Sequence, residues 1–194
     1  MSRPLEPGLV AEGVSDVDFL VPVIDRFLNR LLTARSGTFV DLRPTLASEC
    51  VKKHGKERFV EAARSLGQVC DLVFVHADHH ERREAEALRE LLACPTVVLV
   101  PKRETETWML ADPRAFRGIR GADVSLLPKV ADLEREPAPK ILLARVLRAA
   151  GVRRPTDYFE MLGDEIDLAA LNRVPAFARW AAETERALKG LKYL

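Results

Sequence analysis

The stretch Asp71-Leu-Val-Phe-Val-His-Ala-Asp-His-His80 decides the fold prediction, because an apolar segment turns abruptly into a polar one. Residues 72–75 form a short, uninterrupted apolar run, which is typical of a buried parallel strand. Three of the four histidines of the chain follow within five residues, around Asp78. Ligands of open α/β sheets bind beyond the carboxyl ends of the strands, so this cluster is a candidate site. Imidazole and carboxylate groups there suggest metal binding or proton transfer.

The sequence on both sides of this stretch alternates between strand and helix patterns. Strands are predicted at residues 8–11, 38–42, 72–75 and 96–100. A broad apolar stripe at helical spacing from Val17 to Leu32 predicts a long helix, which we expect Ser15 to cap. Residues 56–66 and 81–92 also read as helical. Four strands separated by helices predict an α/β fold with a mostly parallel sheet.

The pattern changes after Asp112-Pro113. A loop with two glycines covers residues 117–121, and a stiff spacer follows at residues 136–139. Residues 140–150 form an amphipathic helix pattern, and residues 175–191 form another. We therefore predict an α/β domain over residues 1–116 and a helical extension over residues 117–194 that packs on it.

Composition excludes several classes of protein. Of 194 residues, 30 are Lys or Arg and 29 are Asp or Glu, so the formal net charge is only +1. This is not the overall basic excess of a protein that coats nucleic acid, although it leaves room for a local basic surface. The three cysteines lack CxxC spacing, which indicates neither a disulfide framework nor a zinc knuckle. Without a signal-peptide pattern or a long apolar span, we expect a cytoplasmic protein without membrane contacts.

The first candidate site segment is Glu12-Gly-Val-Ser-Asp16, which lies where a predicted strand passes into a helix. Gly13 permits close approach of the backbone, and Ser15 lies at a helix N-terminus, which favours anions such as phosphate. The alternative is a simple strand–helix turn with a solvent-facing glutamate.

The second candidate segment is the histidine cluster after residues 72–75. If the backbone remains extended there, His76, Asp78 and His80 share one face and His79 points away. A polar surface loop is the alternative.

The third candidate segment is Arg103-Glu-Thr-Glu-Thr-Trp-Met-Leu-Ala-Asp112. Because residues two apart lie about 200° apart on a helix, only one of Glu104 and Glu106 is expected to face the site. Trp108 is predicted to be a core residue and not a stacking platform. Hard cations bind to oxygen ligands such as carboxylates. Acids that follow three strands of one sheet are therefore expected to form a site for such a cation.

The order of these segments resembles a TOPRIM-like family of bacterial proteins. The resemblance is carried by Leu-Val-Ala-Glu12-Gly-Val-Ser-Asp16, an apolar strand with an acidic end, and Val100-Pro-Lys-Arg-Glu-Thr-Glu106-Thr-Trp108-Met-Leu-Ala-Asp112. It extends through Pro139-Lys140, Tyr158 and Pro175-Ala-Phe177. The family is related to the TOPRIM domains of topoisomerases, primases and overcoming-lysogenization-defect nucleases, and its members resemble partners of ATPases in phage-defence operons.

The resemblance implies a TOPRIM/Rossmann-like sheet and a Mg²⁺-dependent reaction on phosphodiesters. Glu12 matches the glutamate after the first strand, and Asp78 matches the second aspartate of the Asp-x-Asp pair. Glu106, with Glu104 in reserve, matches the additional acid. The first aspartate of the pair is replaced by His76, and a neutral imidazole is a poorer ligand for Mg²⁺. The site would then hold Mn²⁺ or another nitrogen-tolerant metal, use His76 as a proton shuttle, or have lost catalysis and kept a binding role.

The leading hypothesis is therefore a nuclease, a divalent-metal-dependent phosphodiester hydrolase that acts on nucleic acid with a partner ATPase. The hypothesis assigns catalytic roles to Glu12, His76 and Asp78, metal-ligand roles to Asp78, Glu106, Glu104 and His80, and phosphate contacts to Gly13, Ser15, Arg103 and Lys140. Arg103 and Lys140 have an ordinary surface role as their alternative. A catalytically degenerate interaction or regulatory subunit is the second hypothesis, and a small phosphate-ester hydrolase is the third.

Overall fold

A parallel sheet of four strands, in the order β4-β2-β5-β6, forms the centre of this computed structural model, which describes residues 3–49 and 56–194. The strands are β2 (Pro7–Ala11), β4 (Leu46–Glu49), β5 (Leu72–His76) and β6 (Thr96–Leu99). Two shorter strands, β1 (Arg3–Leu5) and β3 (Val40–Leu42), pair in parallel with each other. Helices connect the strands, so the predicted α/β fold with a parallel sheet is confirmed.

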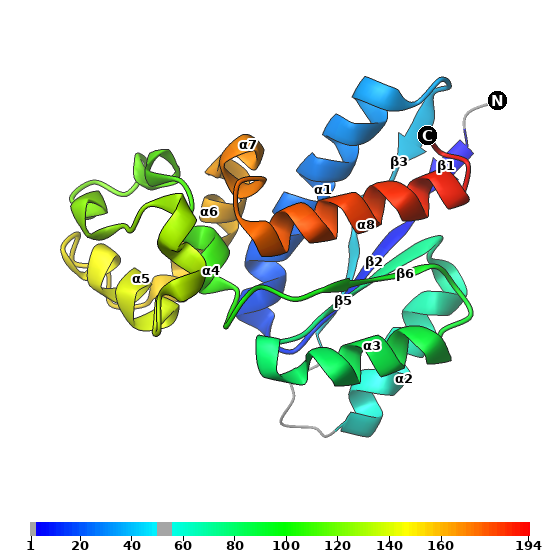
Figure 1. Cartoon of the computed structure of the whole chain (residues 1–194), viewed down its shortest axis with the longest axis horizontal. Coiled ribbons are helices and arrows are strands. Elements are labelled where there is room, and N and C mark those ends of the chain that lie inside the picture. Colours follow the sequence, from blue (N-terminus) through cyan, green and yellow to red (C-terminus); the bar gives the residue numbers. More distant parts are fainter. Residues whose placement is uncertain (1–2, 50–55) are drawn as a thin grey trace.

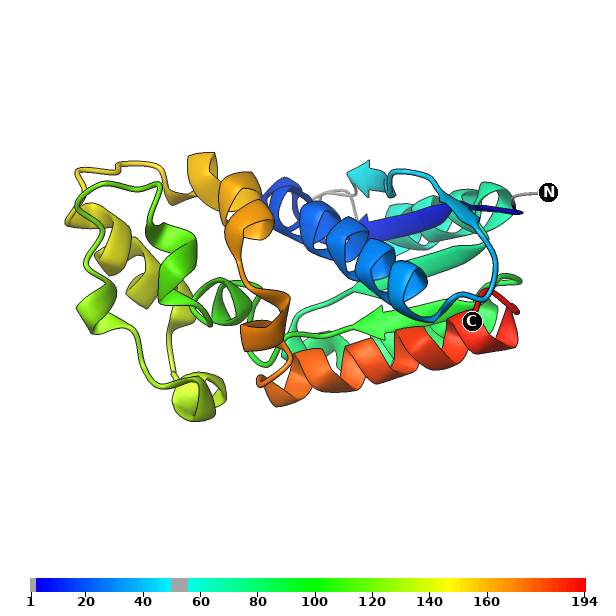
Figure 2. The ribbon, with the colours of Figure 1, turned by 90° about the horizontal axis from the view of Figure 1, so that it is seen from above.

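Helices cover both faces of the sheet (Figures 1 and 2). They are α1 (Val14–Arg35), α2 (Lys56–Val69), α3 (Arg82–Leu91) and α8 (Pro175–Gly190). Side chains alternate between the faces of a strand, and the core divides accordingly. Leu9 and Phe74 share a core with α1 and α8, whereas Val10 and Val75 share a second core with α2 and α3. The result is a three-layer arrangement of helices, sheet and helices.

A group of short helices extends beyond the carboxyl ends of the strands (Figure 1). We call residues 106–171 the helical lobe. It contains α4 (Glu106–Met109), α5 (Pro139–Arg148), α6 (Phe159–Glu165) and α7 (Leu168–Leu171). Short 3₁₀ helices lie between them: η3 (Pro113–Phe116), η4 (Val124–Leu126), η5 (Val130–Arg135) and η6 (Pro155–Tyr158).

The last long helix, α8, leaves the helical lobe and packs along the sheet. The Trp180 ring lies 5.6 Å from that of Phe74 on β5 and 6.2 Å from that of Trp108 on α4. One continuous apolar core therefore joins sheet and lobe. The division into residues 1–116 and 117–194 stays a prediction, but the second part is helical and contacts the first, as expected.

Two local predictions were wrong. Within the predicted strand at residues 38–42, only Val40–Leu42 is extended, and β4 at Leu46–Glu49 occupies the expected position in the main sheet. β4 is a short edge strand with little apolar character, so its sequence lacks the signal of a buried strand. Ser15 does not cap α1, because the helix begins at Val14 with Gly13 as its N-cap and no side-chain cap bond.

The helical lobe is tied to α1 by an unusually close helix contact. Gly163 of α6 lies against Pro22 inside α1, and Arg26 Nη1 donates a hydrogen bond of 2.7 Å to the Gly163 carbonyl oxygen. A Cβ at residue 163 would lie 2.5 Å from the Phe19 carbonyl oxygen and 2.7 Å from Pro22 Cγ. Only glycine permits this approach.

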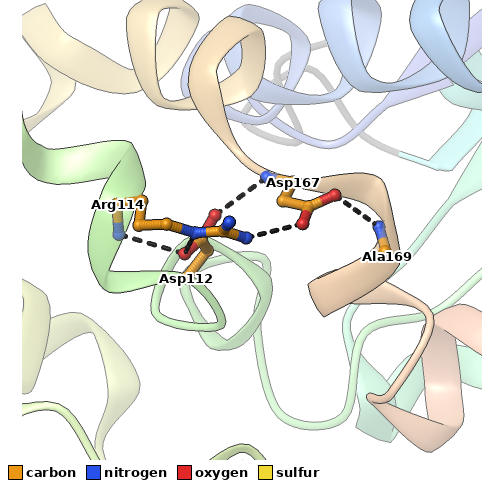
Figure 3. A network of polar contacts seen from close by, with 4 residues as sticks. All are labelled: Asp112, Arg114, Asp167 and Ala169. Atoms are coloured by element: carbon orange, nitrogen blue, oxygen red, sulfur yellow. Dashed lines mark hydrogen bonds and ion pairs between the residues drawn. The ribbon is translucent and has the colours of Figure 1, made fainter.

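A buried carboxylate joins two parts of the lobe (Figure 3). Asp112 Oδ1 accepts hydrogen bonds from the backbone and Nε of Arg114, both at 3.0 Å, and Asp112 Oδ2 accepts one from the Asp167 backbone at 3.1 Å. Arg114 Nη2 donates in turn to Asp167, which caps α7 through the Ala169 amide. The network fixes η3 against α7, at the end of the segment that carries Glu106.

None of the helices within residues 3–49 and 56–194 is both long and apolar enough to cross a membrane.

We predict that Gly163→Ala destabilises the protein by about 1–3 kcal/mol, because α1 and α6 must separate or distort to accept the methyl group. Urea denaturation followed by circular dichroism measures this change. Gly190→Ala is the matched control, since it also lies in a helix but has no atom within 4 Å of the added Cβ. An unchanged unfolding free energy in Gly163→Ala would contradict the proposed close contact.

Candidate functional site

The polar segments that follow three neighbouring strands lie at one edge of the sheet. β2 pairs with β5 in the register Val10 to Val75, and β5 pairs with β6 in the register Val75 to Val98. Pairing of β5 with β6 continues to Ala77, whose amide donates to the Leu99 carbonyl oxygen at 3.1 Å. Adjacent strands lie about 4.8 Å apart, so the segments that follow them begin side by side. These are the three segments in which sequence analysis placed the site.

A single hydroxyl connects the three segments. Thr105 Oγ1, after β6, donates a hydrogen bond of 2.5 Å to Asp16 Oδ1 in the first turn of α1. The same oxygen lies 3.0 Å from Nε2 of His76, the last residue of β5. Thr105 is 1% exposed and His76 is fully buried. The contact therefore fixes all three strand ends relative to one another.

The donors and acceptors in this contact determine whether Nε2 of His76 carries a proton. A hydroxyl has one proton, and Thr105 gives it to Asp16, whose carboxylate oxygen can only accept. Thr105 must then accept from His76, so Nε2 of the imidazole carries a proton. His76 uses this nitrogen to hold Thr105 and does not present it to a ligand. Its predicted catalytic role stays a prediction.

Glu106 has a carboxyl with a strongly raised pKa. It opens α4 and is 6% exposed. Burial raises its pKa to about 7, and the charges of Glu104 and Asp16 add to the increase. A backbone hydrogen bond and the ammonium group of Lys140 act in the opposite direction. At neutral pH, Glu106 can therefore either take up or release a proton.

Lys140 lies at the rim of this site. It is the second residue of α5, and its Nζ lies 3.9 Å from Glu106 Oε1 while its side chain remains 75% exposed. Arg103, also predicted to contact phosphate, is exposed and adopts a left-handed backbone conformation with φ of 72°. Gly13 and Ser15 lie at the N-terminal end of α1, with Gly13 as the N-cap residue. Lys140 thus forms an ion pair with an acid of the site.

The histidine cluster divides at the end of β5. The backbone is extended at Asp78, with φ of −65° and ψ of 155°, and then turns into a 3₁₀ helix, η2 (His79–Glu81). The extended alternation therefore does not reach His80. His80 is exposed and its Nε2 lies 3.6 Å from Glu81 Oε1. His76 and Asp78 are in extended backbone, whereas His79 and His80 lie at the surface.

The two glutamates after β6 do not occupy one helix. α4 begins at Glu106, so Glu104 precedes it and the angular argument made from helical spacing does not apply. The effect of the Glu104 charge on the pKa of Glu106 shows that the two carboxylates are close. Trp108 is fully buried, 5.0 Å from the ring of Phe177, which confirms its prediction as a core residue.

The described residues contain no group of three or more His, Cys, Asp or Glu side chains arranged to hold a metal ion. Mg²⁺, however, keeps several waters and is usually bound by one or two carboxylates together with substrate phosphates. Carboxylates from Glu12, Asp78 and Glu104 are the oxygen donors such an ion prefers. The donor chemistry fits a cation that enters with a phosphate substrate.

Sequence analysis missed Thr105 and the bridging role of Asp16. Thr105 has no recognisable signal, because a threonine between two glutamates resembles any surface position. Asp16 could be recognised as an acid in the first turn of a helix. Acids are common at that position because they interact favourably with the helix dipole, so its presence did not indicate a further role.

Comparison of the chain with protein-family models, with curated proteins and with solved structures returned no match. The resemblance to a TOPRIM-like family therefore rests on the order of the motifs and stays a prediction.

We predict that Thr105→Val lowers the unfolding free energy by about 1–3 kcal/mol, because it removes the partner of two polar groups in a buried setting. Thr105→Ser keeps the hydroxyl and should retain most of that stability. Urea denaturation of both variants beside wild type measures the difference. Equal stability of the Val and Ser variants would contradict a bridging role for the hydroxyl.

We also predict that stability falls as pH rises through the pKa of Glu106. Because this pKa is raised from 4.5 to about 7, the folded state retains a proton that the unfolded state loses. Between pH 5 and pH 8, wild type should lose on the order of 3 kcal/mol relative to Glu106→Gln, which carries no titrating group there. Thermal denaturation across this pH range tests the prediction, and parallel curves for the two proteins would refute it.

Proposed function

We propose that this protein hydrolyses phosphodiester bonds at the carboxyl edge of its sheet, and that its substrate is nucleic acid. The observation that carries the proposal is the buried Glu106 carboxyl, with a pKa of about 7, beside Lys140 and further acids from neighbouring strand ends.

Glu106 has the properties of a general base. A general base works best when its pKa lies near the operating pH, and carboxyls reach that range through burial and like charges. Both causes act on Glu106. Its ionised form would take a proton from the attacking water, and its closeness to Lys140 would stabilise that form.

Lys140 and the start of α1 supply groups for an anionic substrate. Lys140 projects an exposed ammonium group beside Glu106, where a phosphate oxygen could accept a hydrogen bond. Gly13 at the N-cap leaves the first backbone amides of a 22-residue helix near the end of β2. Amides and dipole at such a position favour phosphate.

A divalent cation is part of the proposal. Asp78, with Glu12 and Glu104, would hold Mg²⁺ or Mn²⁺. The bound ion would neutralise the negative charge of the phosphate. The Asp16–Thr105–His76 contact would keep the three strand ends at a fixed separation, so His76 is proposed as a positioning residue.

The second candidate is a regulatory subunit that has kept the fold without catalysis. It is favoured by His76, which occupies the position of an expected acid and uses its Nε2 on Thr105. Titration calorimetry separates the two candidates, because a subunit without catalysis should release no heat with Mg²⁺ or Mn²⁺ in the presence of a non-hydrolysable phosphodiester. A cytoplasmic location, which is expected from the sequence patterns, and an ATPase partner, which the resemblance implies, belong to the proposal in either form.

We predict that Glu106→Gln lowers hydrolysis of bis(p-nitrophenyl) phosphate, DNA or RNA by 10²-fold or more in the presence of Mg²⁺ or Mn²⁺. Glu160→Gln is the matched control, since Glu160 is exposed on α6 and lies outside the site. Wild-type kcat/KM should rise with pH and level off above about pH 7, as Glu106 ionises. Equal rates for wild type and Glu106→Gln on every substrate would remove the assignment.

A further inference from the structure

We propose that an arginine surface at the far end of α5 binds the phosphate backbone of a nucleic-acid strand and leads it into the acidic site. The inference rests on the proposed function, because it assigns the polymer that the site acts on. We define the arginine surface as Arg120, Arg145, Arg148, Arg153 and Arg154.

Charge is distributed very unevenly along the chain. Residues 113–154 contain ten Lys and Arg against four Asp and Glu, whereas the whole chain carries a net charge of only +1. The remaining residues are therefore acidic overall. Residues 137–156 contain no Asp or Glu at all. Residues 113–154, which form the middle of the helical lobe, thus concentrate positive charge that the overall composition hides. Such a local excess is the electrostatic signature of a surface for polyanions.

The five arginines gather around the C-terminal end of α5. Arg145 and Arg148 lie on the exposed face of the helix, and Arg153 and Arg154 follow its end. Arg120 precedes Gly121, where an added Cβ would lie 3.3 Å from Ala150 Cα just beyond α5. Arg148 and Arg153 line one groove of about 260 Å³. The negative end of the helix dipole favours cations at this place.

These side chains are not neutralised by neighbouring carboxylates. Elsewhere in the lobe, Arg114 pairs with Asp112 and Asp167, and Arg135 pairs with Asp132. Across residues 3–49 and 56–194, no ion pair involves any of the five arginines of the surface. All five are exposed. Their guanidinium groups are available to bind phosphate in the two-pronged manner that arginine favours.

Helix α5 connects this surface to the acidic site. Lys140, at its start, lies beside Glu106, and Arg148 is its last helical residue. Lys140, Ala144 and Arg148 follow one another at intervals of four on the same side, while Leu143 and Leu147 face the core. Eight residues of helix span about 12 Å. A strand carries a phosphate about every 3.4 Å along a duplex, so several consecutive phosphates fit between the two ends.

The burial of α5 favours nucleic acid over a membrane. An interfacial helix inserts its apolar face into lipid. In α5 that face, which includes Leu142, Val146 and Leu147, is already packed in the core. Ile141 is its one large apolar side chain that remains mostly exposed. The positive charge of the arginine surface also adjoins, along α5, the site proposed to act on phosphodiesters. A docked acidic protein would not explain that position.

The test is binding of a fluorescein-labelled 20-nucleotide single-stranded DNA, followed by anisotropy in EDTA over a range of NaCl concentrations. The triple variant Arg145→Ala/Arg148→Ala/Arg153→Ala should bind at least tenfold more weakly than wild type. Its slope of log K against log salt should be smaller by about 2, since each lost phosphate contact removes about 0.7. RNA and duplex DNA of the same length identify the preferred strand, and a labelled dinucleotide should bind at least 100-fold more weakly.

The matched control is Arg64→Ala/Arg83→Ala/Arg89→Ala, which removes the same charge from exposed positions of α2 and α3. It should bind within twofold of wild type. Circular dichroism confirms that both triple variants fold. The inference is overturned if both triple variants weaken binding equally, if no 20-mer binds wild type, or if the protein binds only vesicles of phosphatidylcholine with 30% phosphatidylserine.

The inference and the proposed function can fail separately. Binding of the 20-mer by Glu106→Gln, with loss in the arginine variant, supports the surface even if no hydrolysis is found. Hydrolysis of bis(p-nitrophenyl) phosphate without binding of any oligonucleotide supports the site and overturns the surface. If both hold, the arginine variant should lose activity on the 20-mer while keeping wild-type activity on the small ester.

Discussion

The contact of the Thr105 hydroxyl with Asp16 and His76 is the interaction on which the candidate site depends. Thr105 follows β6, His76 ends β5, and Asp16 lies in the first turn of the helix after β2, so the three residues are distant in sequence and meet because their strands are neighbours in the sheet. Parallel strands place their carboxyl ends at one edge, but the loops beyond them are free to diverge. Two hydrogen bonds meet at the Thr105 hydroxyl, which donates to the Asp16 carboxylate and accepts from His76, and together they remove that freedom.

The same contact explains why an imidazole is tolerated at residue 76. A second carboxylate there would face Asp16 across a single hydroxyl in a buried setting, and two like charges so placed oppose each other. A protonated Nε2 instead donates to Thr105 and completes the chain of hydrogen bonds. His76 thus strengthens the framework of the site. The proposed function therefore gives the role of general base to Glu106, whose pKa is raised because it is buried while other acids lie nearby.

The helical lobe therefore contributes two features to the edge of the sheet, a buried carboxyl and a basic surface. It contains Glu106 as a buried residue of α4, a helix that contacts α5 and α6. Gly163 lets α6 approach α1 closely enough to hold the lobe at this edge. The lobe also carries the arginine surface, whose five side chains are exposed. Acidic groups inside and basic groups outside are arranged as expected for a centre that receives an anionic polymer along one helix.

The sequence by itself determined the α/β class, three of the four strands of the main sheet, the long helices and the core position of Trp108, because these depend on apolar periodicity and local propensity. It also located the three segments that meet. It did not reveal β4, whose edge position leaves no apolar pattern, or the N-cap of α1. Only the tertiary structure showed that Thr105 joins Asp16 to His76, that Glu104 lies outside α4, and that the lobe desolvates Glu106. Hydrogen bonds and pKa values depend on which groups approach one another in space, and residues 89 positions apart carry no local sign of that contact.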